Sequence, residues 1–258
     1  MAWGDDLMAA GEAKILHKKT GKVVSIVSAL GAHSTYSPLW RGLDYIAGPT
    51  EHAEIQLVDS PYSRRYREYS DEMGSTWRAY RPIPAEIVFT DSEQEIALHV
   101  PNGFVVIEPN IKNGRDGFLN KDWGWQRYAD VVASLPEVRW LQLGNKHSRH
   151  LPGVEFVETE TFRQACALLA RSRAYLGPEG GLHHACAALG IPAVVIFGGY
   201  ISPSVTGYDS HINLFSGSGL GCGRMLACDC NCMSNIKNEM MVAAMRTLLL
   251  DAGSNATF

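Results

Sequence analysis

The sequence has no apolar run of the roughly 20 residues that a membrane-spanning helix needs. It has no basic N-terminal segment followed by an apolar one, which a secretory signal would show. It also has no large excess of either charge, since its formal net charge is only −4 over 258 residues. These absences exclude a membrane span and a global attraction to polyanions, and they favour a cytoplasmic protein without a membrane partner.

Cysteine is sparse, and its spacing is not that of a standard zinc site. Cys166 and Cys186 lie in apolar, helix-like surroundings, which predicts buried thiols. The other four cysteines are spaced C-x5-C-x-C-x-C, without the C-x2-C pairs of zinc ribbons. Two interpretations stay open for this group, a structural zinc or iron site or a loop of unligated thiols. The four cysteines of this group are Cys222, Cys228, Cys230 and Cys232.

What the chain does contain is an alternation of strand and helix patterns. Residues 5–19 have the apolar spacing of a helix that stops at Gly21, and residues 22–30 follow as a buried strand. From residue 102 to 199 short apolar strands alternate with amphipathic helices, which predicts an α/β fold with a right-handed parallel sheet. Residues 54–58 and 86–90 are the clearest extended pieces between these regions, and a last amphipathic helix covers 238–253.

Ligands of such sheets bind beyond the carboxyl ends of the strands. This rule selects four loops, "EPNIKNGRDGFLNKDW", "LGNKHSRH", "GPEGGLHH" and "FGGYISPSVTGY". We expect all four to face one cleft.

The loop "GPEGGLHH" places Gly180 and Gly181 at the start of a helix, directly after a strand. Free N–H groups and the positive end of the helix dipole favour an anion such as phosphate, although a tight turn without a ligand fits the same pattern. Glu179 is placed either to accept hydrogen bonds from a sugar hydroxyl or to brace the turn. His183 and His184 are about 100 degrees apart on a helix, so we do not expect them to share a zinc ion.

Two further segments carry candidate chemistry. Lys121 precedes a predicted helix, where it either neutralises the charge of a leaving group or is a solvated surface lysine. Asp5 and Asp6 open the first helix, where they either complement its dipole or supply a general base to an acceptor hydroxyl.

Taken in order, these segments resemble glycosyltransferase family 9. "GDDLM" resembles the G-D-x-L segment of that family, and "NKDWGWQRY" resembles its K-x-W-P segment. "GPEGGLHHACAALGIPAVVIFGG" is similar to its D-T-G-x-x-H segment, "SPSVTGYDSHINL" follows at the expected place, and "CNCMSNIKNEMMVAAMRTLL" is similar to its closing helix. The likeness is strongest over residues 103–250.

The resemblance implies a GT-B-type, double Rossmann-like architecture with a reduced N-terminal domain. Residues 1–100 would form the acceptor side, and residues 101–258 the nucleotide-sugar domain, with the last helix crossing back over the cleft. The implied activity is inverting, metal-independent transfer of a heptose or hexose from a nucleotide-diphosphate donor to a hydroxyl of a saccharide, lipid, protein or modified nucleobase. No cofactor is implied, and no oligomeric state is predicted.

The resemblance also assigns site residues by position. Asp5 would be the catalytic base, Lys121 with Gly180 and Gly181 would hold the donor diphosphate, and Glu179 and His184 would contact donor sugar or phosphate. The residues implied near the nucleoside are Gly144, Asn145, Thr161, Phe162 and Arg163.

Glu179-Gly180 stands where the family carries Asp-Thr, so we expect the donor preference to depend on this pair. Two alternatives remain open, a non-catalytic nucleotide-sugar-binding protein and a sugar-nucleotide epimerase.

Overall fold

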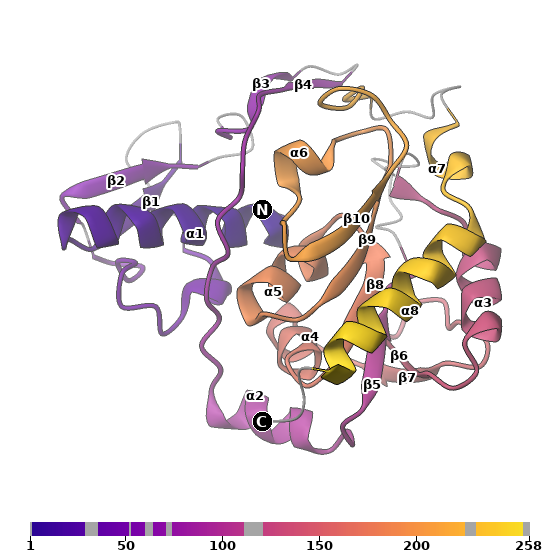
Figure 1. Cartoon of the computed structure of the whole chain (residues 1–258). Coiled ribbons are helices and arrows are strands. Elements are labelled where there is room, and N and C mark those ends of the chain that lie inside the picture. Colours follow the sequence, from indigo (N-terminus) through magenta and orange to yellow (C-terminus); the bar gives the residue numbers. More distant parts are fainter. Residues whose placement is uncertain are drawn as a thin grey trace.

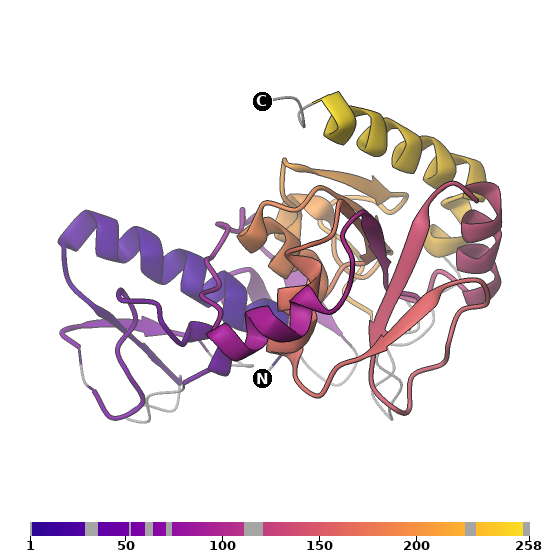
Figure 2. The same cartoon turned by 90° about the horizontal axis from the view of Figure 1, so that it is seen from below.

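The fold is described from a computed structural model of the chain, whose N-terminal and C-terminal parts lie side by side in both views (Figure 1, Figure 2). The described residues are 2–28, 36–51, 53–59, 64–70, 74–110, 121–224 and 231–254.

The C-terminal part is built on a six-stranded sheet in the order β10-β9-β8-β5-β6-β7. All its neighbouring strands are parallel, as the sequence pattern predicts. The chain moves outward from β5 to β7 and then returns to β8 on the other side of β5, as in the doubly wound fold of dinucleotide-binding proteins. The strands are β5 (Phe104–Ile107), β6 (Arg139–Gly144), β7 (Glu155–Glu158), β8 (Ala174–Pro178), β9 (Ala193–Phe197) and β10 (His211–Phe215).

Helices cover both faces of this sheet (Figure 1, Figure 2). Alternate strand residues point to opposite faces, so one core forms with α3 (Trp125–Ser134) and α8 (Asn238–Ser254), and the other with α4 (Phe162–Leu169) and α5 (Gly181–Leu189). The last helix packs on α3 and on β8 to β10. Two short helices, α6 (Pro203–Thr206) and α7 (Cys232–Asn235), complete this part. No helix of the described ranges is both long and apolar enough to cross a membrane.

The N-terminal part is smaller, and its described residues form a sheet of two parallel strands, β1 (Val24–Val27) and β2 (Ile55–Val58). The helix α1 (Trp3–Thr20) precedes β1 and ends at Gly21, whose φ of 68° is the left-handed conformation of a helix stop. A short 3-10 helix, η1 (Pro38–Trp40), and the antiparallel hairpin of β3 (Arg67–Ser70) and β4 (Ser75–Trp77) follow.

Residues 86–90 are extended, but they pair with no strand of the described chain. They belong to the segment that runs along the junction of the two parts from β4 to α2 (Asp91–Leu98) (Figure 1). Thr90 ends this segment because its side chain accepts a hydrogen bond from Glu93 N, while the Glu93 carboxylate accepts one from Thr90 N. Alternating apolar residues thus mark a partly buried connection here rather than a strand.

The two parts share one hydrophobic core. Leu7, Ala10 and Ala13 of α1 belong to the same buried cluster as Leu182 and Ala185 of α5. The β3–β4 hairpin adds a second contact, because Ser75 N donates to Gly223 O at 2.9 Å and Trp77 Nε1 donates to Tyr200 O at 2.7 Å. The first turns of α1 are therefore held against α5 of the C-terminal part.

Gly11 sets the distance between α1 and the junction segment. A Cβ atom at this position would lie 2.0 Å from the Ile83 carbonyl oxygen, which is backbone and yields only if the helix moves. Alanine normally stabilises a helix by up to about 1 kcal/mol relative to glycine. Gly11→Ala is nevertheless expected to lower the free energy of unfolding by about 1–3 kcal/mol, since overpacking outweighs propensity.

Urea unfolding of Gly11→Ala measures this effect, with Lys19→Ala on the exposed end of the same helix as the control. The control is expected to stay within about 0.5 kcal/mol of the parent protein. A more stable Gly11→Ala variant would show that α1 does not pack as closely as the structure has it.

Candidate active site

A cavity of about 440 Å³ lies where the strand order reverses, between the carboxyl ends of β5 and β8. This volume is within the roughly 300–1,000 Å³ typical of small-molecule sites. Glu108 and Asn110 line it after β5, and Glu179 to Gly181 line it after β8. The site therefore sits at the switch point where doubly wound sheets bind their ligands.

The N-terminus of α5 opens into this cavity through Gly180 and Gly181. No side chain of the described residues caps this helix end. Its first N–H groups are consequently available to an acceptor from outside the helix, and the helix dipole favours an anionic one.

Lys121 and Glu179 form an ion pair on the wall of the cavity. The ammonium group also donates to Glu179 O at 3.4 Å and lies 5.6 Å from the centre of the Tyr200 ring. Burial alone would raise the pKa of Glu179, but Lys121 and His184 outweigh it and hold this pKa below the usual range of a carboxyl group. Glu179 is therefore a carboxylate whose partner is a cation on the same wall.

His184 connects the Lys121–Glu179 ion pair to the side chain of Tyr208. Its Nε2 atom lies 3.6 Å from Glu179 Oε1, and its Nδ1 atom lies 2.9 Å from the Tyr208 hydroxyl. His184 also lines the cavity, although the residue as a whole is buried. The two contacts fix the orientation of the ring at the cavity wall.

His183 and His184 lie closer together than their helical positions suggested. Their ring centres are 4.5 Å apart, and a ligand atom from each of them lies within 4.8 Å of a carboxylate oxygen of Glu179. The expectation that adjacent positions separate the two histidines is therefore wrong, because rotation about the side-chain bonds brings the rings together. These three residues could hold a metal ion, and Lys121 contacts the Oε2 atom of Glu179 whereas His184 lies nearest its Oε1 atom.

Both nitrogens of His183 are buried and have no hydrogen-bond partner within the described ranges. Burial, together with the neighbouring His184 and His211, holds the pKa of His183 well below its ordinary value. Burial also lowers the pKa of His211 to about 4. His183 and His211 are thus uncharged near neutral pH and add no positive charge to the site.

Asp5 faces the cavity from the first turn of α1. The Arg64 guanidinium pairs with Asp5 Oδ2, and the Tyr66 hydroxyl donates to Asp5 Oδ1. A carboxylate has about four acceptor positions on its two oxygens, so one that carries two partners can still accept a hydroxyl proton. Arg64 and Tyr66 thus orient the Asp5 carboxylate and leave it able to accept a proton from a hydroxyl group.

Aromatic side chains form much of the remaining wall. Trp3 of α1 stacks on Phe162 of α4 with ring centres 5.3 Å apart and an interplanar angle of 6°. Trp77 of the hairpin packs edge-on against Tyr200 at 5.0 Å. Apolar and aromatic walls beside a few polar groups are typical of small-molecule binding sites.

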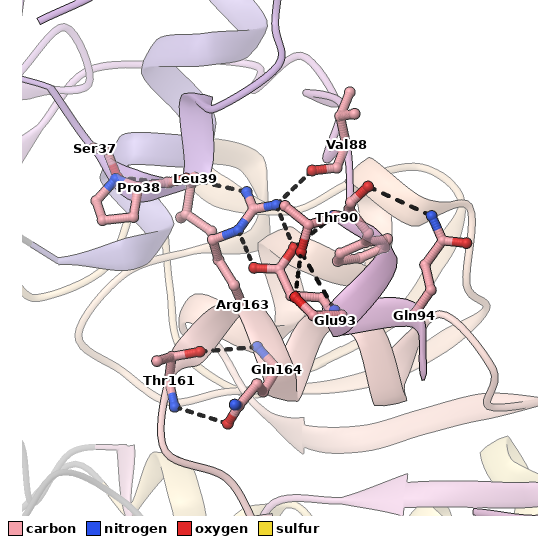
Figure 3. Close-up of polar contacts among 12 residues, drawn as sticks. Ser37, Pro38, Leu39, Val88, Thr90, Glu93, Gln94, Thr161, Arg163 and Gln164 are labelled. Carbon is pink, nitrogen blue, oxygen red and sulfur yellow. Dashed lines mark hydrogen bonds and ion pairs between the residues drawn. The ribbon is translucent and has the colours of Figure 1, made fainter. Parts of the chain in front are cut away.

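Seven of the predicted site residues line the cavity, and four do not. The seven are Asp5, Lys121, Phe162, Glu179, Gly180, Gly181 and His184. Gly144 is the last residue of β6 and Asn145 follows it, where Ser148 Oγ accepts from Asn145 N. Thr161 caps α4, because its hydroxyl accepts from Gln164 N at 3.2 Å (Figure 3).

The Arg163 side chain forms a structural ion pair with Glu93. Its guanidinium forms a bidentate ion pair with Glu93 of α2, with Nε to Oε1 at 2.6 Å and Nη2 to Oε2 at 2.8 Å. It also donates to Pro38 O at 3.0 Å and to Val88 O (Figure 3). Because α4 turns Arg163 toward α2, this side chain joins the N-terminal part and the junction segment to the C-terminal part rather than entering the cavity.

The cysteine group is only partly described. Cys222 is exposed and Cys232 is buried at the start of α7, whereas Cys228 and Cys230 lie outside the described residues. The alternatives of a structural metal site and unligated thiols therefore stay as the sequence left them.

Several wall residues were not singled out from the sequence. Tyr66 and Tyr200 come from irregular segments and Trp77 ends the short strand β4, and no periodicity in these parts of the sequence shows which side chains face a ligand. Glu108 is different, because it directly follows the predicted strand of "GFVVIEPN". A carboxylate at that point of a parallel strand is a signal that could have been used.

Comparison with known proteins finds similarity in structure but not in sequence. No protein-family model and no curated protein matches the chain. Among solved structures, the ADP-heptose LPS heptosyltransferase II of E. coli matches with 18% identity and a TM-score of 0.49, covering 64% of this chain and 54% of that one. A family 9 glycosyl transferase of Veillonella parvula DSM 2008 matches with 14% identity and a TM-score of 0.49, covering 66% and 55%.

The iron-containing heptosyltransferase TibC of enterotoxigenic E. coli, solved as a dodecamer with ADP-D-beta-D-heptose, matches with 16% identity and a TM-score of 0.46, covering 67% and 50%. The chain spans about half the length of these three structures.

Proposed function

We propose that this chain is a cytoplasmic, inverting glycosyltransferase that moves a heptose or hexose from a nucleotide-diphosphate donor to an acceptor hydroxyl. One observation carries the proposal. Asp5 of the N-terminal part lines the same cavity as Lys121 and the open end of α5 in the C-terminal part. A proton acceptor thus faces an anion-binding helix end and a cation, the combination that glycosyl transfer with a diphosphate leaving group requires.

In the proposed reaction, the acceptor oxygen attacks the anomeric carbon of the donor while the bond from that carbon to the diphosphate breaks. Asp5 accepts the proton of the attacking hydroxyl. Lys121 and the first N–H groups of α5 stabilise the charge that develops on the departing diphosphate. Attack from the side opposite the diphosphate inverts the anomeric centre.

No metal takes part in this step, because the protein supplies the positive charge itself. Glu179 and His184 contact the donor sugar or phosphate, and Phe162 lies toward the nucleoside. Residues 1–100 carry the acceptor side and residues 101–258 the donor side. The acceptor is a saccharide, lipid, protein or modified nucleobase.

A thermal-shift panel of nucleoside diphosphates and nucleotide sugars tests the donor half of this proposal. A ligand at about 100 times its Kd is expected to stabilise the folded state by about 2.7 kcal/mol through mass action. Lys121→Ala is expected to weaken binding about 10- to 100-fold, since it removes a charge-assisted contact worth about 1.5–3 kcal/mol.

The control is Lys146→Ala, because Lys146 is exposed and does not line the cavity. It is expected to bind like the parent protein. An unchanged midpoint with every compound of the panel would overturn the proposed function.

A further inference from the structure

Glu108 is a wall residue that the proposed reaction does not use. It follows β5, the central strand at the switch point, and its side chain is only partly buried where it reaches the cavity. The Tyr175 hydroxyl of the neighbouring strand β8 donates to Glu108 Oε2. A Cβ atom on Gly177 would lie 2.2 Å from that hydroxyl and 2.9 Å from Glu108 Cβ, so the missing side chain at Gly177 lets the two groups meet.

Within the described residues, the titratable groups around Glu108 come from three elements and one loop. Tyr175 lies on β8, Tyr128 on α3, Cys186 on α5, and Lys121 precedes α3. Burial raises the pKa of Tyr128, Tyr175 and Cys186, so these three are neutral near pH 7. Lys121 is the charged member of this group.

Burial likewise raises the pKa of Glu108 to about 7, although the hydrogen bond from Tyr175 and the charge of Lys121 oppose the shift. The carboxyl group is therefore divided between its two protonation states near neutral pH. Any new charge in the cavity changes this division.

A diphosphate in the cavity would bring such a charge. It adds negative charge beside Glu108, and it draws on Lys121, whose ammonium group is already shared with Glu179. A like charge within about 4–6 Å disfavours a carboxylate and raises its pKa further. Once protonated, a carboxyl group no longer repels phosphate and has an O–H group to donate to it.

We propose that Glu108 is a further binding residue of this cavity, which contacts the diphosphate ligand as a neutral carboxylic acid and takes up one proton from solvent as the ligand enters. No covalent bond of the ligand changes in this step. The proton moves from the buffer to a Glu108 oxygen, and the complex gains one positive charge. This inference rests on the proposed function, because it needs a diphosphate in the cavity.

Calorimetric titration in buffers of different ionisation enthalpy measures the proton uptake directly. The probes are ADP-glucose, UDP-glucose and GDP-mannose, whose fully esterified diphosphates do not themselves titrate near neutral pH. For a free pKa of about 7, the parent protein is expected to take up about three quarters of a proton at about pH 7.5. Its Kd is expected to rise about tenfold from about pH 6 to about pH 8.

Glu108→Gln imitates the neutral acid, so its uptake is expected to fall to near zero and its Kd to become independent of pH. Tyr175→Phe removes a hydrogen bond that lowers the pKa of Glu108. In this variant a larger fraction of Glu108 is already protonated in the free protein. The proton uptake on binding is therefore expected to fall, while the nucleotide sugar still binds. Glu95→Gln, an exposed carboxyl group on α2, is the control and is expected to keep the full uptake.

The outcomes separate this inference from the proposed function. Binding without proton uptake, or the same uptake in Glu108→Gln, overturns the role of Glu108 and leaves the donor site in place. Failure of all three probes to bind overturns both.

Discussion

Replacing Asp5 by asparagine is expected to lower kcat for sugar transfer by about 10²- to 10⁴-fold, the usual loss when a general base is removed. Asparagine keeps the shape of aspartate, but its amide cannot accept the hydroxyl proton. Donor binding is expected to remain, because Asp5 lies on α1, whereas the proposed contacts to the diphosphate are Lys121 and the first N–H groups of α5. The rate is measured as release of nucleoside diphosphate from the donor that the binding panel identifies.

Asp6→Asn is the matched control for this variant. Asp6 is the next residue and is also buried, but it does not line the cavity, and its Oδ2 atom accepts a hydrogen bond from Ser37 at 2.7 Å. Unfolding curves of both variants separate a catalytic loss from a folding loss, since Asp5→Asn also leaves Arg64 without its charged partner. Equal loss of transfer in the two variants would remove the assignment of Asp5 as the base.

Replacing Arg163 by alanine is expected to lower the free energy of unfolding by about 3–5 kcal/mol, because it leaves a buried carboxylate without its partner. The side chains of Arg163 and Glu93 are only 5% and 11% exposed. The same change removes the hydrogen bonds to Pro38 O and Val88 O, which link the N-terminal part and the junction segment to α4 (Figure 3). Equilibrium unfolding in urea measures the loss.

Arg139→Ala provides the comparison, since Arg139 pairs with Glu155 at 2.6 Å but the two side chains are 36% and 44% exposed. An exposed ion pair contributes about 0–1 kcal/mol, so this variant is expected to stay close to the parent protein. Similar losses for the two variants would show that the Arg163 contact does not stabilise the junction.

The Arg163 effect is also expected to depend on pH. Hydrogen bonds from Arg163, opposed by burial, lower the pKa of Glu93 from 4.5 to about 2. A lowered carboxyl pKa contributes stability above the unfolded value and loses it as pH falls toward the folded value. The difference between the parent protein and Arg163→Ala is therefore expected to shrink below about pH 4.5. A difference that stays constant down to about pH 3 would contradict this ion pair.

The regular elements of this protein could be predicted from its sequence. The first helix and its stop at Gly21, the strands β5, β6, β8 and β9, and the helices between them all lie where local apolar periodicity places them. Periodicity is a local property, since it follows from which side chains of one element are buried. Residues 86–90 are extended as predicted but belong to no sheet of the described chain, because their burial on one side comes from the junction of the two parts.

The location of the site could also be predicted, because the carboxyl ends of parallel strands meet at one edge. Its chemistry depends on partners that are far apart in the chain. Tyr66 contacts Asp5 across 61 positions, and Lys121 contacts Glu179 across 58. Arg163 turned toward Glu93, 70 positions away, and not toward the cavity.

The sequence by itself determined the parallel sheet, its covering helices and the loops that end at one edge, since short-range burial patterns encode these. Only the tertiary structure decided which side chains meet there. It paired Lys121 with Glu179, brought His183 and His184 together, and placed Glu108 beside Tyr175. The physical reason is that charge pairing, burial and pKa depend on distances through space, which no local pattern of residues records.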